Sequence, residues 1–93
     1  MSEIYRYEVP VDDQWHRFEL YGSVVHVAAR KEDVVEFWAY HSPEVFGSPF
    51  VEHFRVVGTG QPVPKGENRW VNVRHVGTAL VGPFAWHLIK EVP

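Results

Sequence analysis

The stretch Phe50–Pro64 limits most strongly what this chain can fold into, because a strand-like alternation of side chains stops there at glycines and prolines. From Phe50 to Val57, successive side chains of an extended chain point to opposite faces. Gly58 and Gly60 can adopt positive φ without a Cβ clash, and the two prolines that follow lack the N–H of a central strand. The sequence therefore predicts a strand that ends by Val57 and a tight turn after it.

Six further segments show the same period of two and are bounded by turn residues: residues 3–11, 15–20, 24–30, 34–41, 70–81 and 84–91. No segment has apolar residues at a spacing of 3.6 over the length of an ordinary helix. We therefore expect an all-β fold in which residues 1–93 form one domain. The predicted architecture is a single antiparallel meander of about seven strands, forming a barrel or a two-sheet sandwich.

Short connections favour pairing between consecutive strands. We expect a first hairpin between residues 3–11 and 15–20. A second hairpin should join residues 24–30 to residues 34–41, which we expect to form a central strand. Gly77 interrupts a strand and predicts a bulge or a close backbone approach there. The first and last strands should either meet or leave protected edges.

Composition excludes several classes of protein. The chain has no cysteine, so it can form neither a disulfide framework nor a thiolate site. Its net charge is −3 and its nine basic residues are scattered, whereas a nucleic-acid binder needs clustered Lys and Arg for phosphate contacts. The first ten residues are too charged for a signal peptide, and no window approaches the roughly 18 consecutive apolar residues of a membrane span. We therefore expect a soluble cytoplasmic protein with no membrane partner and no nucleic-acid partner.

Six histidines suggest a metal site, but no two of them are two or four residues apart. A site could assemble across strands from His53, His75 and His87. The period of two, however, places these side chains on the face opposite Phe54 and Trp86. We therefore expect surface or hydrogen-bonded structural histidines, with no metal and no cofactor.

The sequence contains no catalytic motif. Gly58-Thr59-Gly60 is followed by prolines and a strand, whereas a phosphate loop opens onto a helix that holds the anion. The serines lie in turns without a nucleophile elbow. Glu36 and Glu52 lie in apolar strands and, if buried, should pair with arginine, because an unpaired buried charge costs on the order of several kcal/mol. The candidate arginines are Arg17, Arg55 and Arg74. We therefore expect a protein that is not an enzyme.

Several sequence blocks cover nearly the whole chain: YRYEVPVDDQWH, EFWA, FRVVGTGQPVP, and VGTALV followed by FAWHL. Together they resemble a family of small proteins of uncharacterised function encoded by actinobacteria and by the bacteriophages that infect them. The most specific parts are Phe54-Arg55 with Gly58-Thr59-Gly60, Gly77-Thr78 and Trp86-His87. The resemblance implies a phage or actinobacterial protein of the cytoplasm that binds and modulates a host protein. It transfers no catalytic residue.

We therefore favour a non-enzymatic protein-binding module, in which a rigid β-scaffold presents residues 42–49 and 61–69 to a host or cellular protein. Aromatic residues and arginine dominate the energetics of interfaces. The predicted anchors are Val45, Phe46, Arg69 and Trp70. The protein would act as a monomer, or as a homodimer formed through an open sheet edge.

The alternative function is that of a small-molecule-binding barrel or an enzyme with an aromatic-lined pocket. The rings that would line it are Trp15, Trp38 and Trp86. Such a site would need a pocket of at least ~300 Å³ with converging polar groups.

Overall fold

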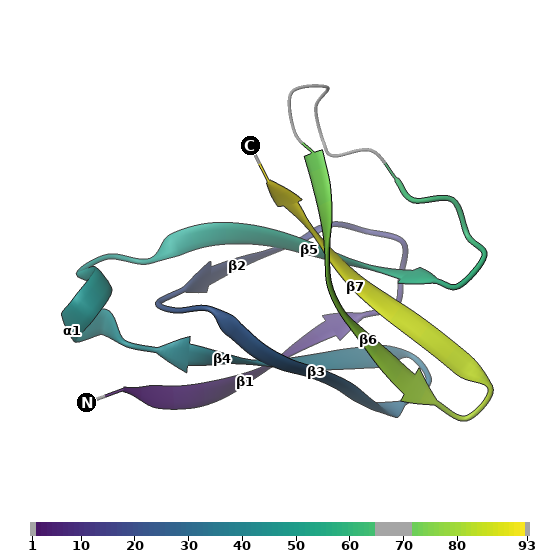
Figure 1. Ribbon diagram of the computed structural model, residues 1–93, viewed down its shortest axis with the longest axis horizontal. Helices are drawn as coiled ribbons and strands as arrows, with labels where there is room; N and C mark the ends of the chain where they lie inside the picture. Colours follow the sequence, from purple (N-terminus) through teal and green to yellow (C-terminus); the bar gives the residue numbers. More distant parts are fainter. Residues whose placement is uncertain (1, 65–71, 93) are drawn as a thin grey trace.

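A computed structural model describes residues 2–64 and 72–92, and within these residues it contains seven strands in two antiparallel sheets (Figure 1). The elements are β1 (Glu3–Pro10), β2 (His16–Leu20), β3 (Val24–Lys31), β4 (Val34–His41), α1 (Pro43–Phe46), β5 (Phe50–Gly58), β6 (Asn72–Val81) and β7 (Phe84–Val92). Sheet A has the strand order β1-β4-β3, and sheet B has the order β2-β5-β7-β6. The predicted all-β class is therefore confirmed.

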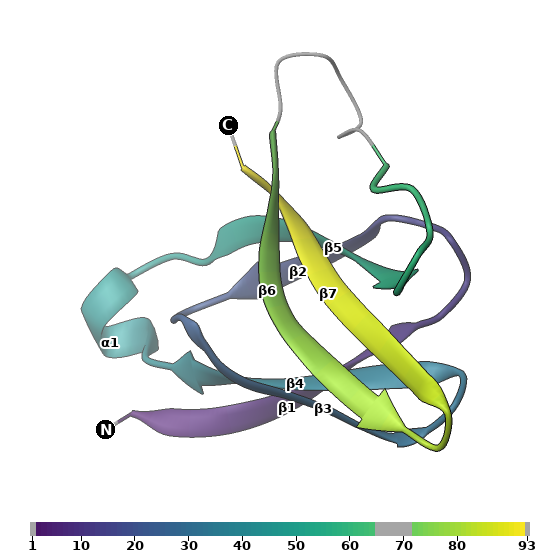
Figure 2. The ribbon, with the colours of Figure 1, turned by 45° about the vertical axis from the view of Figure 1, so that its right-hand side comes forward.

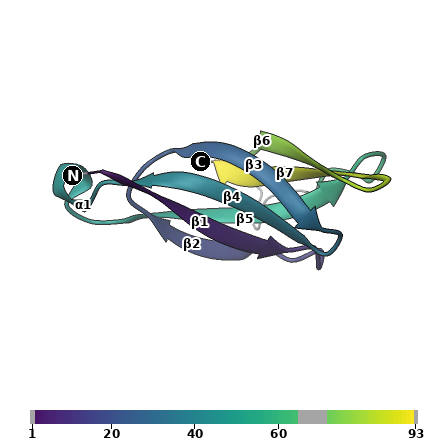
Figure 3. The same cartoon turned by 90° about the horizontal axis from the view of Figure 1, so that it is seen from below.

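The two sheets form a sandwich and are not closed into a barrel. Figure 1 shows sheet A below strands β2 and β5 of sheet B. Seen from below, β3, β4 and β1 lie side by side in that order (Figure 3). The β6–β7 hairpin of sheet B runs steeply across the molecule towards β3, the edge strand of sheet A (Figure 2). It therefore covers one open side of the sandwich.

The predicted first hairpin is wrong. β1 pairs with β4 in sheet A, whereas β2 pairs with β5 in sheet B. The connection between β1 and β2 crosses from one sheet to the other, so the two strands face each other across the interior. The rings of Tyr7 and Phe18 meet there edge to face, with centroids 5.9 Å apart. The second hairpin, β3–β4, is confirmed, and β4 is the central strand of sheet A.

The first and last strands do not meet. β1 is an edge strand of sheet A, whereas β7 lies inside sheet B between β5 and β6. The meander is therefore limited to the hairpins β3–β4 and β6–β7, and the other neighbours in each sheet are strands distant in sequence. The expected loop 42–49 contains one helical turn, α1, which is too short to change the fold class.

Apolar side chains from both sheets fill the interior. The side chains predicted to share one face of β4, those of Val35, Phe37 and Ala39, are all fully buried. Phe37 meets Phe54 of β5 with ring centroids 4.7 Å apart, and the Phe18 ring packs on both. Alternation thus places one face of each sheet in a shared aromatic core.

The predicted bulge at Gly77 is confirmed, because the β6–β7 register shifts between His75 and Gly77. Gly77 also lies against β3. A Cβ atom built on it would meet Cγ2 of Val27 at 2.6 Å. Glycine at this position therefore allows the β6–β7 hairpin to close on sheet A.

We predict that Gly77→Ala destabilises the fold by about 1–3 kcal/mol, because the added methyl group overpacks the contact with Val27. Urea unfolding followed by tryptophan fluorescence measures the change in the free energy of unfolding. In a Val27→Ala background the same substitution should cost at least about 0.5 kcal/mol less, since the two sites are in contact. An equal cost in both backgrounds would show that the contact is not the cause.

Candidate functional site

The helical turn α1 presents two of the predicted anchors to solvent. Val45 is 73% exposed and Phe46 is 49% exposed. The turn is held by Ser42, whose carbonyl oxygen accepts the N–H groups of Val45 at 3.0 Å and Phe46 at 3.1 Å. The Phe46 ring lies 5.7 Å from that of Phe50, measured between centroids. The two predicted anchors therefore form an exposed apolar knob.

Further large apolar side chains are exposed at the same end of the sandwich. They come from the adjoining ends of β1, β4 and β5, and they are Ile4, Tyr5, Tyr40 and Val51. Figure 1 shows α1 beside the start of β1 and the end of β4. Ile4 and Tyr40 are direct cross-strand partners. We call this region, made of these four residues with Val45 and Phe46, the α1 end.

The two predicted loops do not form one surface over the residues that are described. β5 runs from Phe50 at the α1 end to Gly58 at the other end, a nine-residue strand of roughly 30 Å. Residues 61–64 follow Gly58 and lie at the opposite end of the sandwich (Figure 1). The other two predicted anchors, Arg69 and Trp70, lie outside the described residues.

A charged groove of about 380 Å³ lies on the outer face of sheet A, and Glu36 lies at its base. Although Glu36 is only 3% exposed, its carboxylate accepts bonds from Arg30 at 2.8 and 2.7 Å and from Arg6. These bonds, led by those from Arg30, lower the pKa of Glu36 to about 2. The carboxylate is therefore ionised and fully engaged at neutral pH.

The predicted partners of the acidic strand residues are wrong. Glu36 pairs with arginines of the two flanking strands, β1 and β3, and Glu52 pairs with Lys90 at 3.2 Å. The expectation that Glu36, if buried, pairs with arginine is confirmed. Which residue pairs with Glu36 depends on which strands flank β4. The period of two carries no information on the order of strands in a sheet.

A second hollow, of about 420 Å³, lies on the outer face of sheet B beside the turn that follows β5. We call it the sheet B recess. Four aliphatic side chains contribute to its lining: Val57, Val63, Val73 and Ile89. Its polar side includes His75, His87, Thr59 and Gln61. An apolar surface with a few converging polar groups is typical of a ligand site.

The polar side chains at the recess form a hydrogen-bonded cluster with Thr78. Nε2 of His87 lies 2.8 Å from Oγ1 of Thr59, and its Nδ1 lies 3.0 Å from Oγ1 of Thr78. Nε2 of His75 lies 3.0 Å from the same Thr78 oxygen and 3.3 Å from Nδ1 of His87. The cluster joins β6, β7 and the turn after β5.

A tight turn follows β5 as predicted, although the strand ends at Gly58, one residue later than expected. The backbone N–H of Gly58 donates to Oε1 of Gln61 at 2.7 Å, and the N–H of Gln61 donates back to the carbonyl of Gly58 at 3.1 Å. Gly60 has a φ of 88°, which favours glycine. The N–H of Thr59 donates to the carbonyl of Ala85 at 3.2 Å, so the turn is tied to β7.

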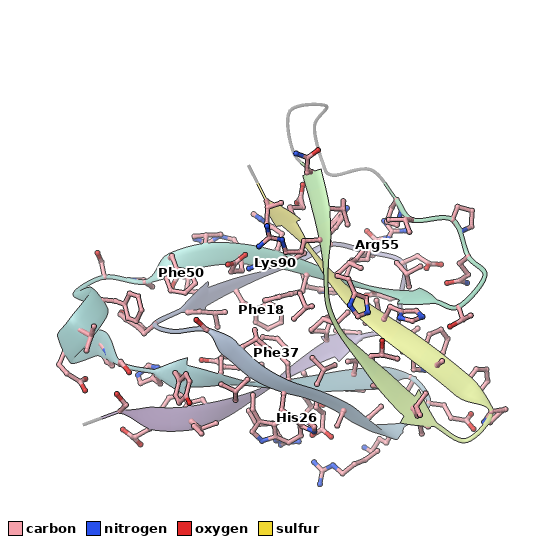
Figure 4. The ribbon with its side chains drawn as sticks, viewed as in Figure 1. Phe18, His26, Phe37, Phe50, Arg55 and Lys90 are labelled. Carbon is pink, nitrogen blue, oxygen red and sulfur yellow. The ribbon has the colours of Figure 1, made fainter. Side chains whose placement is uncertain are left out.

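Residues of the motifs distinguished in the sequence lie together on the outer face of sheet B. Thr59, Thr78 and His87 belong to the cluster, and Arg55 is the cross-strand partner of Ile89. Arg55 lines a neighbouring hollow of about 400 Å³, and its Nε is buried with no hydrogen-bond partner among the described residues. Figure 4 shows Arg55 on the side of sheet B away from Phe37. The period of two placed His87 on the face opposite Trp86, but it gave no indication that Thr59 and Thr78 contact His87.

The three-histidine site considered in the sequence is not formed. His53 lies on the same face, but its Nδ1 is 3.9 Å from a carboxylate oxygen of Glu91 rather than in the cluster. Within residues 2–64 and 72–92, no three side chains of His, Cys, Asp and Glu gather as metal ligands. His75 and His87 nevertheless contact each other, without His53.

The three tryptophans do not line one cavity. Figure 4 shows His26 on the outer side of sheet A. The Trp38 ring lies beside it, with ring centroids 5.5 Å apart. Trp86 stacks on Phe84 and donates its indole N–H to the carbonyl of Glu32 at 3.0 Å. A pocket of the required size therefore exists at the sheet B recess, without the tryptophan lining that the sequence suggested.

Comparison with family models gives a match to a domain of unknown function over residues 1–93. Comparisons with curated proteins and with solved structures found no match for the chain. In the described part of the chain, no helix is long and apolar enough to cross a membrane.

We predict that the stabilising effect of Glu36 disappears in acid. Its pKa is lowered from 4.5 to about 2 on folding, so its contribution is complete above pH 4.5 and is lost as the pH falls towards 2. The free energy of unfolding of the wild type should exceed that of Glu36→Gln at pH 7, and this difference should shrink by up to about 3 kcal/mol at pH 2. Urea unfolding at both pH values measures it.

Glu8→Gln is the matched control, because Glu8 lines the same groove but is exposed and lies 3.8 Å from Arg6. It should change stability by less than about 1 kcal/mol at either pH. A difference between wild type and Glu36→Gln that is the same at pH 7 and pH 2 would contradict the role assigned to the arginines.

Proposed function

The chain belongs to the family described as domain of unknown function (DUF7352), and we propose that it is a non-enzymatic protein-binding module that contacts its partner through the α1 end. The observation that carries the proposal is the gathering there of exposed large apolar side chains from α1, β1, β4 and β5. Exposed apolar patches on a protein surface typically mark an interaction site, and at this end Ile4 and Tyr40 lie side by side as cross-strand partners. Fully burying a side chain such as Val45 or Phe46 contributes roughly 1.5–3 kcal/mol.

The α1 end is pre-organised for binding. Two backbone hydrogen bonds to Ser42 fix the turn, and the N–H of Ser42 donates to the carbonyl of Tyr21 at 3.0 Å. The Ser42 hydroxyl donates to the Ser2 hydroxyl at 2.6 Å. Because the turn is already ordered, a partner has little conformational entropy to remove on binding.

The charge around the α1 end favours a protein over a nucleic acid. Residues 42–49 contain Glu44 and no Lys or Arg. A surface that binds phosphates needs cationic side chains, whereas an interface core is depleted of charge and enriched in aromatic residues. Tyr5 and Tyr40, with Phe46, supply those rings.

The partner we propose is a host protein, and the chain an accessory protein of an actinobacterium or of a phage that infects one. The resemblance of the sequence blocks supports this origin, and it supports the cytoplasm as the place of action. The module would act as a monomer, or as a homodimer through an edge strand such as β1.

A second candidate function is small-molecule binding in the sheet B recess. Its volume of about 420 Å³ and its combination of aliphatic and polar side chains favour this function. A fragment screen by NMR should shift the amide signals of Val57, Val73 and Ile89. A screen that shifts none of these amide signals would rule out small-molecule binding in the recess.

We predict that Phe46→Ala and Val45→Ala each weaken capture of the partner from an actinobacterial lysate by about tenfold or more, the effect of losing about 1.4 kcal/mol of binding free energy. Captured proteins are quantified by mass spectrometry, and the dissociation constant is then measured with the purified partner. Circular dichroism verifies that each variant is folded. Trp70→Ala in the same series tests the anchor predicted from the second loop.

Leu80→Ala is the matched control, because Leu80 is 74% exposed, as Val45 is, but lies on β6 away from α1. It should capture the partner as the wild type does. Undiminished capture by both α1 variants, or an equal loss in Leu80→Ala, would overturn the assignment of the interface to the α1 end.

A further inference from the structure

The two clustered histidines have the spacing of ligands on one metal ion. Nε2 of His75 and Nδ1 of His87 are 3.3 Å apart, and Oγ1 of Thr78 is 3.0 Å from each. A tetrahedral zinc ion with Zn–N bonds of about 2.0–2.1 Å holds two nitrogens about 3.3–3.4 Å apart. The observed distance between the two imidazole nitrogens therefore matches the distance between two nitrogen ligands on one zinc ion.

We propose that His75 and His87 bind one divalent transition-metal ion at the sheet B recess, through Nε2 and Nδ1 respectively. Imidazole nitrogen suits zinc, copper and nickel, whereas magnesium and calcium prefer oxygen ligands. The Thr78 hydroxyl is placed to hydrogen-bond a water that completes the coordination. In the metal-free protein the same atoms form the hydrogen-bonded cluster, which agrees with the structural histidines expected from the sequence.

The bulge in β6 brings Thr78 to the two histidines. His75 is the cross-strand partner of Ile89, and a regular register would then place Gly77 opposite His87. The shift between His75 and Gly77 places Thr78 opposite His87 instead. The hydroxyl therefore lies between the two imidazoles.

The protonation state that a metal requires is supported by the turn after β5. If Nδ1 of His87 is a ligand, its proton must lie on Nε2, and that N–H then donates to Oγ1 of Thr59 at 2.8 Å. Metal-bound histidines almost always donate their second N–H in this way, which orients the ring. Thr59 is thus a positioning residue, itself tied to Ala85 through its backbone.

The surroundings admit a hydrated cation. Both histidines line the recess, which has room for water molecules on the ion, and its described lining contains no Lys or Arg to repel it. Because only two protein nitrogens are supplied, binding should be weaker than at structural zinc sites with four protein ligands. Copper should bind more tightly than nickel or zinc, following the general order of affinities.

The experiment titrates untagged protein with zinc, nickel or copper chloride at pH 7.5, using isothermal calorimetry and NMR of the imidazole signals. We expect one ion per chain. His75→Gln and His87→Gln should each lower the affinity at least about tenfold, as removal of one of two ligands requires. Thr59→Val should lower it about 10–100-fold, because it removes the acceptor that orients His87. Magnesium should not bind.

His53→Gln and His26→Gln are the matched controls, since both histidines lie outside the cluster. They should bind the metals as the wild type does, and circular dichroism should show every variant folded. Failure of the wild type to bind any of the three metals at about 1 mM, a free energy near −4 kcal/mol, would overturn the site. Binding that is unchanged in both His75→Gln and His87→Gln would also overturn it. The recess is remote from the α1 end, so either result leaves the proposed partner interface untouched.

Discussion

The contact between the rings of Phe37 and Phe54 is the interaction on which the rest of this structure depends. The first ring comes from the central strand of sheet A and the second from β5 of sheet B, and both are fully buried. A chain of this length encloses a small interior, so a few large side chains must supply most of the apolar contact between the sheets. Removing either ring would leave a cavity that costs about 3–5 kcal/mol, a large part of the stability of such a domain.

The same packing determines where polar chemistry can lie. Glu36 directly precedes Phe37, and His87 directly precedes Leu88. Because successive side chains of a strand point to opposite faces, burying Phe37 and Leu88 sends Glu36 and His87 to the outer faces of sheets A and B. The charged groove and the sheet B recess are therefore consequences of the register that fills the core.

Alternation in the sequence predicted the strands well, and β4 was predicted from Val34 to His41 as it is found. Alternation failed to predict the neighbours of β1 and β2. A period of two indicates which face of a strand a side chain lies on, but not which strand pairs with it. The partners of Glu36 were wrong for the same reason, since its arginines come from flanking strands. The position of Thr78 opposite His87 depends on a one-residue shift of register, for which Gly77 was the local signal.

Gly77 links the closure of the sandwich to the histidine cluster. Its missing Cβ allows β6 to approach Val27 of β3, and the register shift beside it sets Thr78 opposite His87. The two histidines are 12 residues apart in the chain and meet only through this paired hairpin. The cluster therefore exists only in the folded state, and a ligand that binds it would stabilise the fold by mass action. The α1 end, in contrast, is held by hydrogen bonds that Ser42 makes within the turn and to Tyr21 and Ser2, so its binding surface does not depend on the β6–β7 hairpin.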